Sequence, residues 1–385
     1  WPMGERFMLS NAQRRYLGLN PLEAHWDVMD IKGTLYYFEG DTIRKEISTS
    51  DSGEGPLHYR ESELDVQTTE NRTVVLPKTA RGKPRKLNLT ATRSFRPYGT
   101  YFSYGYGRVI IGNYTTQKTF YSESLNEGDS AAVLSAWMEK WVADTTEGDL
   151  EELETFRTEK REHQNYREGD IFEFKFGRRR HGFGKILIDV TKRRKTKDFK
   201  RNKNCGLSNL MGTALVVKVY HRISDTIEVD IDELERGMAL PPQIVMDNTI
   251  FYGEHKVIGN RAVAYKELDD TPISVSRSID ATDPDFAYLQ YGLIYRELTL
   301  SEYKTHEDED WYHRDYRREG NGFTLDLQNL ERCVREGSNA PFYPDADKGG
   351  LNNPRNKEDK NRVFAIFGLD GRLGYEGNLR LHQAR

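Results

Sequence analysis

The chain has 385 residues, of which 36% are hydrophobic, 31% charged and 11% aromatic, and its formal net charge is -4 at pH 7. This length predicts two or three domains of roughly 100–200 residues, each with its own core. The aromatic content excludes a disordered chain, and the charge balance excludes a uniformly basic nucleic-acid binder. No apolar run approaches the roughly 20 residues of a membrane span, and the two cysteines and an N-terminus without an apolar signal segment favour a cytoplasmic protein that contacts no membrane.

The first part of the chain predicts a sheet-rich domain over residues 8–128. A short helix is expected over Ser10–Leu17, with Ser10 as its N-cap. Between Trp26 and Phe120, runs of β-branched and aromatic residues are bounded by Gly, Pro, Asn or Asp, a pattern typical of strands and turns.

Helical patterns follow this domain. Apolar residues recur at helical spacing between Ser130 and Trp141, and a strongly charged helix is expected from Asp149 to about His163. We interpret residues 129–165 as a helical spacer.

Alternation of apolar and polar residues over Gly169–Phe176 then predicts a strand that opens a second β-domain, with Phe183–Asp189 as the returning arm of a hairpin. The remaining expectations are strands at Ala214–Tyr220, Gln243–Phe251, Ala262–Leu268 and Arg362–Phe367, and helices at Asp230–Glu235, Asp283–Tyr291 and Asp326–Arg335. We therefore expect an α+β fold that is predominantly antiparallel β. It would have curled or barrel-like β-domains at 8–128 and 166–304, joined by helices, and a C-terminal α/β extension at 305–385.

Two segments of the chain resemble each other. Gly105–Ile111 and Gly182–Ile188 both read Gly-aromatic-Gly-basic followed by three β-formers. Because glycine permits a bend or bulge in a strand, both segments are predicted to be the second arm of a curled hairpin. Shared turn chemistry explains the likeness as well as duplication does.

The charge is segregated along the chain. Residues 178–203 hold twelve Lys and Arg against two Asp, whereas residues 204–310 hold 20 Asp and Glu against nine Lys and Arg. The basic stretch either pairs with the acidic remainder and solvent or contacts phosphates or an acidic protein face. The candidates for a basic patch are Arg178, Arg179, Arg180, Lys192, Arg193 and Arg194.

Aromatic residues are dense between Tyr98 and Tyr121. Core packing is the expected role for most of them. Because Arg93, Arg96 and Arg108 are interleaved with them, the aromatic residues also permit base stacking. A nucleic-acid-associated binding protein that uses the basic 178–203 loop and nearby aromatic residues is the first alternative function.

Two short motifs carry a resemblance to a known family. Glu168–Phe174 and Gly182–Leu187 resemble the opening of the immunity protein 26 family of bacterial polymorphic toxin systems, and the likeness extends over about residues 166–300. It implies a non-enzymatic protein whose partner is a cognate toxin or effector domain, neutralised by occlusion of its active or binding surface. Since carboxylates can occupy the phosphate-binding surface of a basic enzyme, the toxin-binding candidates are acidic. They are Asp225, Glu228, Asp230, Asp232, Glu233, Glu235, Glu307, Asp308, Glu309 and Asp310.

Catalytic signatures are weak in this sequence. The stretch that begins at His306 lacks the spacing of a helical zinc site, and Gly177–Lys185 displaces the lysine of a phosphate-binding loop. Cys205 and His221 could pair as nucleophile and base, although packing is the usual role of an isolated cysteine. We expect no catalytic residues, no metal and no cofactor, and keep a metal-dependent hydrolase as the weaker alternative.

Overall fold

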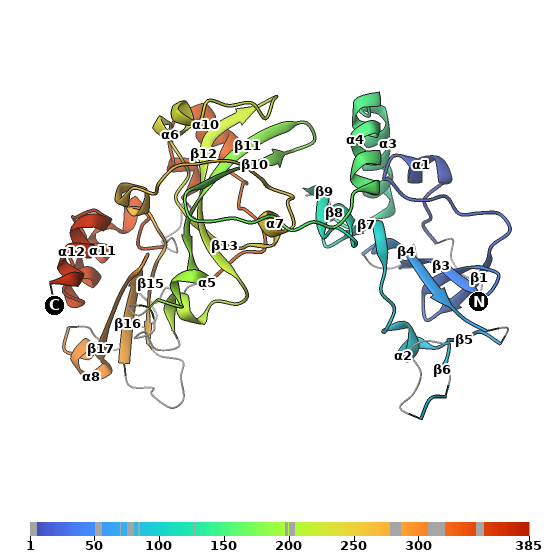
Figure 1. Cartoon of the computed structure of the whole chain (residues 1–385), viewed down its shortest axis with the longest axis horizontal. Helices are drawn as coiled ribbons and strands as arrows, with labels where there is room; N and C mark the ends of the chain where they lie inside the picture. The colour runs from blue at the N-terminus through green and yellow to red at the C-terminus, as the bar shows by residue number, and fades with distance from the viewer. Residues whose placement is uncertain are drawn as a thin grey trace. The chain divides into compact units, whose positions relative to one another are not determined.

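The structure is a computed structural model, and the chain divides into two compact units, residues 1–163 and 164–385. The description covers residues 6–50, 56–69, 71–74, 81–83, 85–125, 128–196, 199, 205–277, 286–306, 320–343 and 350–384. None of the helices in these ranges has the length and apolar character needed to cross a membrane. Each unit is described separately below (Figure 1).

The first unit is built on an antiparallel sheet of seven strands in the order β1-β2-β3-β4-β7-β8-β9. The strands are β1 (Asp27–Ile31), β2 (Thr34–Glu39), β3 (Thr42–Thr49), β4 (Tyr59–Gln67), β7 (Tyr98–Gly105), β8 (Arg108–Asn113) and β9 (Lys118–Ser124). A short ribbon of β5 (Thr73–Val74) and β6 (Arg85–Lys86) and the helix α2 (Leu89–Thr92) lie between β4 and β7 in the chain.

The helices of this unit begin where the sequence provides N-caps. Ser10 caps α1 (Asn11–Arg15), as predicted, and Ser130 and Thr146 cap α3 (Ala131–Ala143) and α4 (Glu147–Thr158). Leu134, Trp137 and Leu153 of α3 and α4 belong to the same buried cluster as Phe102 and Ile111 of the sheet. The helices predicted within the 129–165 spacer therefore contribute to the core of the first unit.

The second unit contains two antiparallel sheets. One has the order β13-β12-β11-β10-β14 and the other β15-β16-β17. The strands are β10 (Asp170–Phe176), β11 (Arg180–Asp189), β12 (Ala214–Ser224), β13 (Gln243–Met246), β14 (Lys256–Asn260), β15 (Ile273–Arg277), β16 (Phe286–Tyr291) and β17 (Ile294–Thr299). The expected antiparallel α+β class is confirmed, whereas the five-stranded sheet is open, with β13 and β14 at its edges, and a barrel-like shape is not confirmed.

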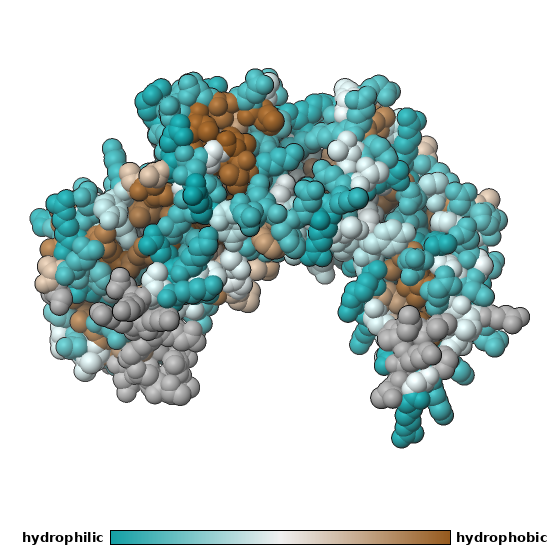
Figure 2. All heavy atoms as spheres, in the orientation of Figure 1, coloured by the Kyte–Doolittle hydropathy of each residue, from teal (hydrophilic) through white to brown (hydrophobic). Residues whose placement is uncertain are grey.

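Short helices surround these sheets. The α-helices are α5 (Val190–Arg193), α6 (Ile231–Arg236), α7 (Asn248–Phe251), α8 (Leu300–Lys304), α10 (Leu330–Glu336), α11 (Lys357–Ile366) and α12 (Tyr375–Gln383). The 3-10 helices are η2 (Gly206–Asn209), η3 (Tyr265–Leu268), η4 (Ala340–Phe342) and η5 (Pro354–Asn356). Figure 2 shows hydrophilic residues over much of the visible face, with apolar residues gathered over the region of β10–β12 and α10.

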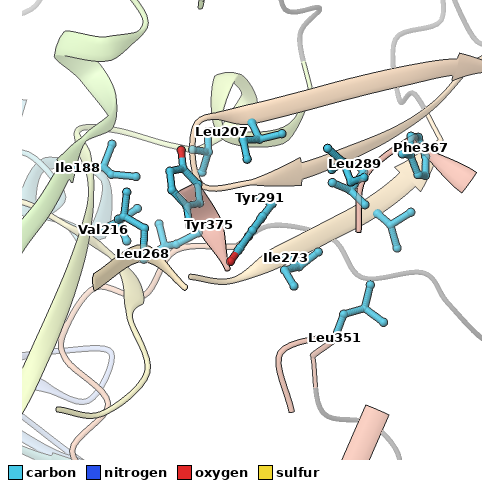
Figure 3. Close-up of a cluster of buried hydrophobic side chains, with 14 of the residues drawn as sticks. Ile188, Leu207, Val216, Leu268, Ile273, Leu289, Tyr291, Leu351, Phe367 and Tyr375 are labelled. Carbon is cyan, nitrogen blue, oxygen red and sulfur yellow. The ribbon is translucent and has the colours of Figure 1, made fainter. Parts of the chain in front are cut away.

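The C-terminal segment shares its core with the sheets of this unit. Leu289 and Tyr291 of β16 lie in one buried cluster with Phe367 and Tyr375, which come from the end of the chain (Figure 3). The hydroxyl of Tyr375 also accepts a hydrogen bond from the backbone N–H of Leu293. Within the predicted 305–385 extension, Phe367 and Tyr375 thus bury apolar surface against the smaller sheet, and Leu330 and Cys333 lie in the core cluster of the larger sheet.

Four predicted elements in this unit are wrong in type, wholly or in part. Where Asp283–Tyr291 was expected to be a helix, the described residues form β16, whose six residues are all buried. Arg362–Phe367 was expected to be a strand but lies mostly in α11, because Val363, Phe364 and Phe367 face one core at helical spacing. A short apolar run does not distinguish a buried strand from a buried helix. The remaining two are Ala262–Leu268, which ends in η3, and Gln243–Phe251, which divides into β13 and α7.

The two Gly-aromatic-Gly segments have different structures. Tyr106 and Gly107 have φ values of 52° and 66° and form the tight turn between β7 and β8, with Tyr106 92% exposed. Phe183, in contrast, is buried inside β11. The prediction that both segments are second arms of a hairpin holds for Arg108–Ile111, which lie in β8, but the Gly-aromatic-Gly part of the first segment is the turn itself.

The glycines in β11 allow close packing of aromatic rings on the strand. A Cβ atom at Gly184 would lie 2.4 Å from the ring of Phe172 and 2.8 Å from the carbonyl oxygen of Lys218. A Cβ atom at Gly182 would likewise lie 2.4 Å from the ring of Phe174. These glycines are required by space rather than by backbone conformation.

We predict that Gly184→Ala lowers the free energy of unfolding by about 1–3 kcal/mol, because the methyl group must displace a buried ring and a backbone carbonyl. Gly320→Ala is the matched control, since a Cβ there meets nothing within 4 Å. Chemical denaturation of both variants measures the difference. Equal stabilities would show that β11 adjusts freely.

His255 is buried in the core of the larger sheet. Its ring stacks on Phe172, with centroids 5.7 Å apart and an interplanar angle of 5°, and lies 5.7 Å from Phe174. Burial lowers the pKa of His255 to about 3, so the imidazole is neutral in the folded protein at neutral pH.

A pH dependence of stability follows. Below about pH 6.5 the unfolded chain binds a proton at His255 that the folded chain does not bind until about pH 3. The free energy of unfolding therefore decreases as the pH is lowered from about 6.5 to about 3. We predict that His255→Leu reduces this slope by up to about 1.4 kcal/mol per pH unit, measured by denaturation at pH 7, 5.5 and 4. Phe174→Leu, which perturbs the same cluster but keeps the imidazole, is expected to retain the wild-type slope. Equal slopes for wild type and His255→Leu would contradict this account.

Candidate functional site

An acidic surface lies on the second unit, between β12 and the end of α6. Asp225, Glu228, Asp230, Asp232 and Glu233 are all exposed, and we call these five residues the α6 surface. Asp230 caps α6, because its carboxylate accepts hydrogen bonds from the backbone N–H groups of Glu233 and Asp232. These backbone hydrogen bonds lower the pKa of Asp230, so its charge persists in mildly acidic solution.

The opposite face of α6 is anchored to the sheet. Leu234 is 5% exposed and lies in a buried cluster with Ile171, Phe183 and Tyr220. Glu235, which the sequence placed with the toxin-binding candidates, points toward this interior: its carboxylate accepts hydrogen bonds from the ammonium of Lys185 and the hydroxyl of Tyr220. The helix α6 thus presents Asp232 and Glu233 to solvent and directs Glu235 toward the interior.

A buried ionic network lies beneath α6. The Nζ atom of Lys185, whose side chain is fully buried, is 2.7 Å from Glu235, 3.0 Å from Glu267 and 3.2 Å from the carbonyl oxygen of Ala262. Lys218 is 2.6 Å from the other oxygen of Glu267. The network connects β11, β12, α6 and η3.

Electrostatic balance explains why this network is tolerated in the interior. Burial alone would raise the pKa of Glu267, but its hydrogen bond and ion pair with Lys218 hold that pKa below its ordinary value. Burial, followed by the hydrogen bond to Glu235, raises the pKa of Tyr220, so its hydroxyl stays a donor. Two ammonium groups face two carboxylates, and no net charge is left in the interior.

The basic candidates largely contact their own unit. Arg180 forms an ion pair with Glu331 at 2.8 Å, and Arg193 forms one with Glu168 at 2.6 Å. Arg194 donates hydrogen bonds to the carbonyl oxygens of Leu207 and Leu210, and Lys192 lies 3.3 Å from Asp189. Arg178 and Arg179 lie in the turn between β10 and β11. This arrangement corresponds to the intramolecular alternative for the basic stretch.

Four of the acidic candidates and part of the basic 178–203 stretch are not among the described residues. Glu307, Asp308, Glu309 and Asp310 lie outside the described residues, and so do Lys197, Lys200, Arg201 and Lys203.

The aromatic residues of the first unit divide between core and surface. Phe102, Tyr104 and Phe120 are buried in the core, as predicted for most of this group. Tyr106 instead flanks an open depression of about 820 Å³ on the sheet, which Arg60 and Arg108 also line. This surface belongs to the unit for which the sequence suggested base stacking.

The residues considered for catalysis are separated. The Sγ atom of Cys205 lies 2.9 Å from the hydroxyl of Tyr295, whereas Nε2 of His221 lies 2.7 Å from Oδ1 of Asn339. Cys205 and Cys333 are both buried free thiols. Among the described residues no three His, Cys, Asp or Glu side chains are arranged to hold a metal ion.

One site was missed by sequence reasoning. A pocket of about 510 Å³ in the second unit is lined by residues of the 164–166 segment, the end of β11, α5 and α7, among them Asp189 and Asp247. Asp189 is the last residue of the apolar strand β11, and Asp247 directly follows β13. A carboxylate at the end of an apolar strand was the sequence signal that could have indicated this site. The convergence of the two aspartates depends on the pairing of β11, β12 and β13, which the sequence does not specify.

Comparison with known proteins gives one match. The model of the family Immunity protein 26 matches residues 167–285, which confirms the resemblance seen in the sequence. The matched segment contains the α6 surface, the buried network and Asp247. Neither the curated proteins nor the solved structures compared with the chain gave a match. The matching family indicates toxin immunity as the general function of this segment, and such proteins are generally non-enzymatic.

We predict that Lys185→Met lowers the free energy of unfolding by about 3–5 kcal/mol, because Glu235 loses its cation and Glu267 keeps only one. Lys256→Met is the control: Lys256 is exposed on β14 of the same sheet, and its loss should change stability by less than about 0.5 kcal/mol. Urea denaturation measures both. A Lys185→Met variant as stable as the control would mean that the network does not hold α6 in place.

Proposed function

We propose that this protein is a cytoplasmic immunity protein that binds a cognate bacterial toxin and neutralises it by covering its active or binding surface. The match of residues 167–285 to Immunity protein 26 carries the proposal. Occlusion requires a rigid surface of suitable charge and no reacting groups, and the second unit offers such a surface at α6.

The rigidity of the α6 surface comes from its anchoring. Leu234 and Glu235 fix the inner side of the helix to the apolar cluster and to Lys185, while Asp232 and Glu233 point outward and are 64% and 65% exposed. A binding surface that is already ordered loses less conformational entropy on association.

The charge of the surface suggests the chemistry of the partner. A cluster of exposed carboxylates attracts a protein with a positive surface, such as an enzyme that binds phosphate groups, and opposite potentials accelerate association and select partners. Asp232 is paired with Arg261 and Glu233 lies 4.0 Å from Arg222, but these contacts are solvent-exposed and contribute little. The carboxylates can therefore exchange these partners for those of a toxin.

Co-expression tests this proposal. Cells that express the toxin encoded beside the gene for this protein should grow when the protein is co-produced, and the two chains should copurify as a complex of fixed stoichiometry. Failure to restore growth, with both proteins produced, would reject the proposal.

The α6 surface is tested by charge reversal. We predict that the triple variant Glu228→Lys, Asp232→Lys and Glu233→Lys weakens toxin binding at least ~100-fold, about 2.7 kcal/mol, mainly through slower association. Asp230 is left unchanged because it caps the helix. The matched control reverses three exposed glutamates elsewhere in the unit, Glu336, Glu358 and Glu376, so that the net charge changes equally. Equal affinities of the two triple variants, measured by surface plasmon resonance, would exclude α6 as the toxin-binding surface.

A further inference from the structure

The pocket that the sequence did not reveal has the chemistry of a cation site. Its volume of about 510 Å³ lies within the range of roughly 300–1,000 Å³ found for small-ligand pockets. We call it the Tyr166 pocket, after the residue that connects the incoming segment with α7. Its polar lining includes two aspartates, Asp189 and Asp247, which are 3% and 8% exposed.

The two carboxylates differ in what satisfies them. Asp189 accepts a hydrogen bond from the backbone N–H of Lys192 at 2.9 Å, and its other oxygen lies 3.3 Å from the ammonium of Lys192. Asp247 accepts a hydrogen bond from the hydroxyl of Tyr166 at 2.7 Å but forms no ion pair with any residue in the described ranges. Because the Asp247 side chain is largely buried and has no cation, a positively charged ligand in the pocket would stabilise its carboxylate.

Lys192 does not complete the charge balance. Its side chain is 61% exposed, and its ammonium also donates to the carbonyl oxygen of Tyr166, 3.2 Å away. Among the residues that line the pocket, two carboxylates are thus accompanied by one ammonium that is largely in solvent, while Arg193, outside the lining, interacts with Asp189 as well as with Glu168. Consistent with this deficit, burial and the neighbouring charge of Asp189 act to raise the pKa of Asp247. In the Lys185 network of the same unit, by contrast, every carboxylate has a cation.

The apolar lining of the pocket suits a delocalised or alkyl-substituted cation. Tyr166, Phe251 and Tyr252 contribute aromatic rings, and Phe251 and Tyr252 pack edge to face with centroids 5.1 Å apart. Lys192 already lies 5.8 Å from the centroid of the Tyr166 ring, which shows that a cation can approach this aromatic face. Carboxylates beside aromatic rings are the groups that recognise guanidinium and alkylammonium ions.

We propose that the Tyr166 pocket binds a guanidinium or alkylammonium group, with the carboxylate of Asp247 as its principal ion-pair partner. The source of that group is an arginine or lysine side chain of the toxin, and this part of the inference rests on the proposed function. The α6 surface then supplies long-range attraction, and the pocket supplies a buried anchor of the kind that dominates binding energy at interfaces.

The chemistry is tested on the full chain without a toxin. Titration with butylguanidinium chloride and with butylammonium chloride, followed by NMR, should give millimolar or tighter binding to the wild type, whereas sodium butyrate should not bind. Asp247→Asn keeps the size of the side chain and an acceptor for Tyr166, and we predict at least 10-fold weaker binding of both cations. Glu358→Gln, at an exposed acid of the same unit outside the α6 surface, should leave their affinity unchanged.

Folding of the variant is checked by its thermal transition. Because Asp247→Asn removes a buried charge that has no cation, the variant should be at least as stable as the wild type. Absence of binding of both cations to a folded wild-type chain would overturn the inference, as would equal affinity of the wild type and Asp247→Asn.

The source of the cation is tested with the toxin. Asp247→Asn should weaken toxin binding at least ~30-fold, and Glu358→Gln should leave it nearly unchanged. Binding of the small cations with an unchanged toxin affinity would overturn the assignment to a toxin side chain and identify a site for a free amine or guanidine. Rescue of growth by a wild-type chain that binds neither cation would reject the pocket and retain the proposed function.

Discussion

The second unit is organised around one buried charge, the ammonium of Lys185. Lys185 lies in β11 among buried residues, and a cation in such a place must be neutralised by carboxylates brought from elsewhere in the chain. Glu235 comes from α6 and Glu267 from η3, so the requirement for neutrality fixes both segments over the sheet. The first unit uses the same device, since Glu61 in its sheet is held by Lys45 at 2.6 Å and by Arg14 at 2.8 Å.

Carboxylates that are paired with cations in the interior differ in their expected role from carboxylates that are exposed or lack a cation. Where carboxylates and ammonium groups are matched in the interior, they position elements and leave little for a partner to bind. Where carboxylates are exposed on α6, or buried without a cation at Asp247, binding of a positive partner improves their electrostatic energy. A basic toxin surface would complement the carboxylates of α6, and a protruding cationic side chain would complement Asp247.

Local features of this fold were predictable from sequence, and distant pairings were not. The side chains of Ser10 and Asp230 accept hydrogen bonds from backbone N–H groups no more than three residues further along the chain, and the helices that they cap occur where expected. Whether β16 and α11 form a strand or a helix depends on burial against distant segments. Such short apolar runs are compatible with the periodicity of a strand and with that of a helix. The partner of Lys185 at Glu267 is 82 residues away, so no local pattern could indicate that Lys185 is structural. The Tyr166 pocket could not be predicted for the same reason, because its lining residues come from distant segments. The immunity protein 26 motifs indicated only the part of the chain in which it lies.

Hydrogen–deuterium exchange of the full chain, with and without its toxin, tests the central claim most directly. If the second unit binds the toxin through α6, the backbone amides of residues 225–236 exchange more slowly in the complex, because the toxin excludes water from this segment. Protection confined to residues 6–163, with residues 225–236 exchanging at the same rate in both states, would contradict the account and assign binding to the first unit.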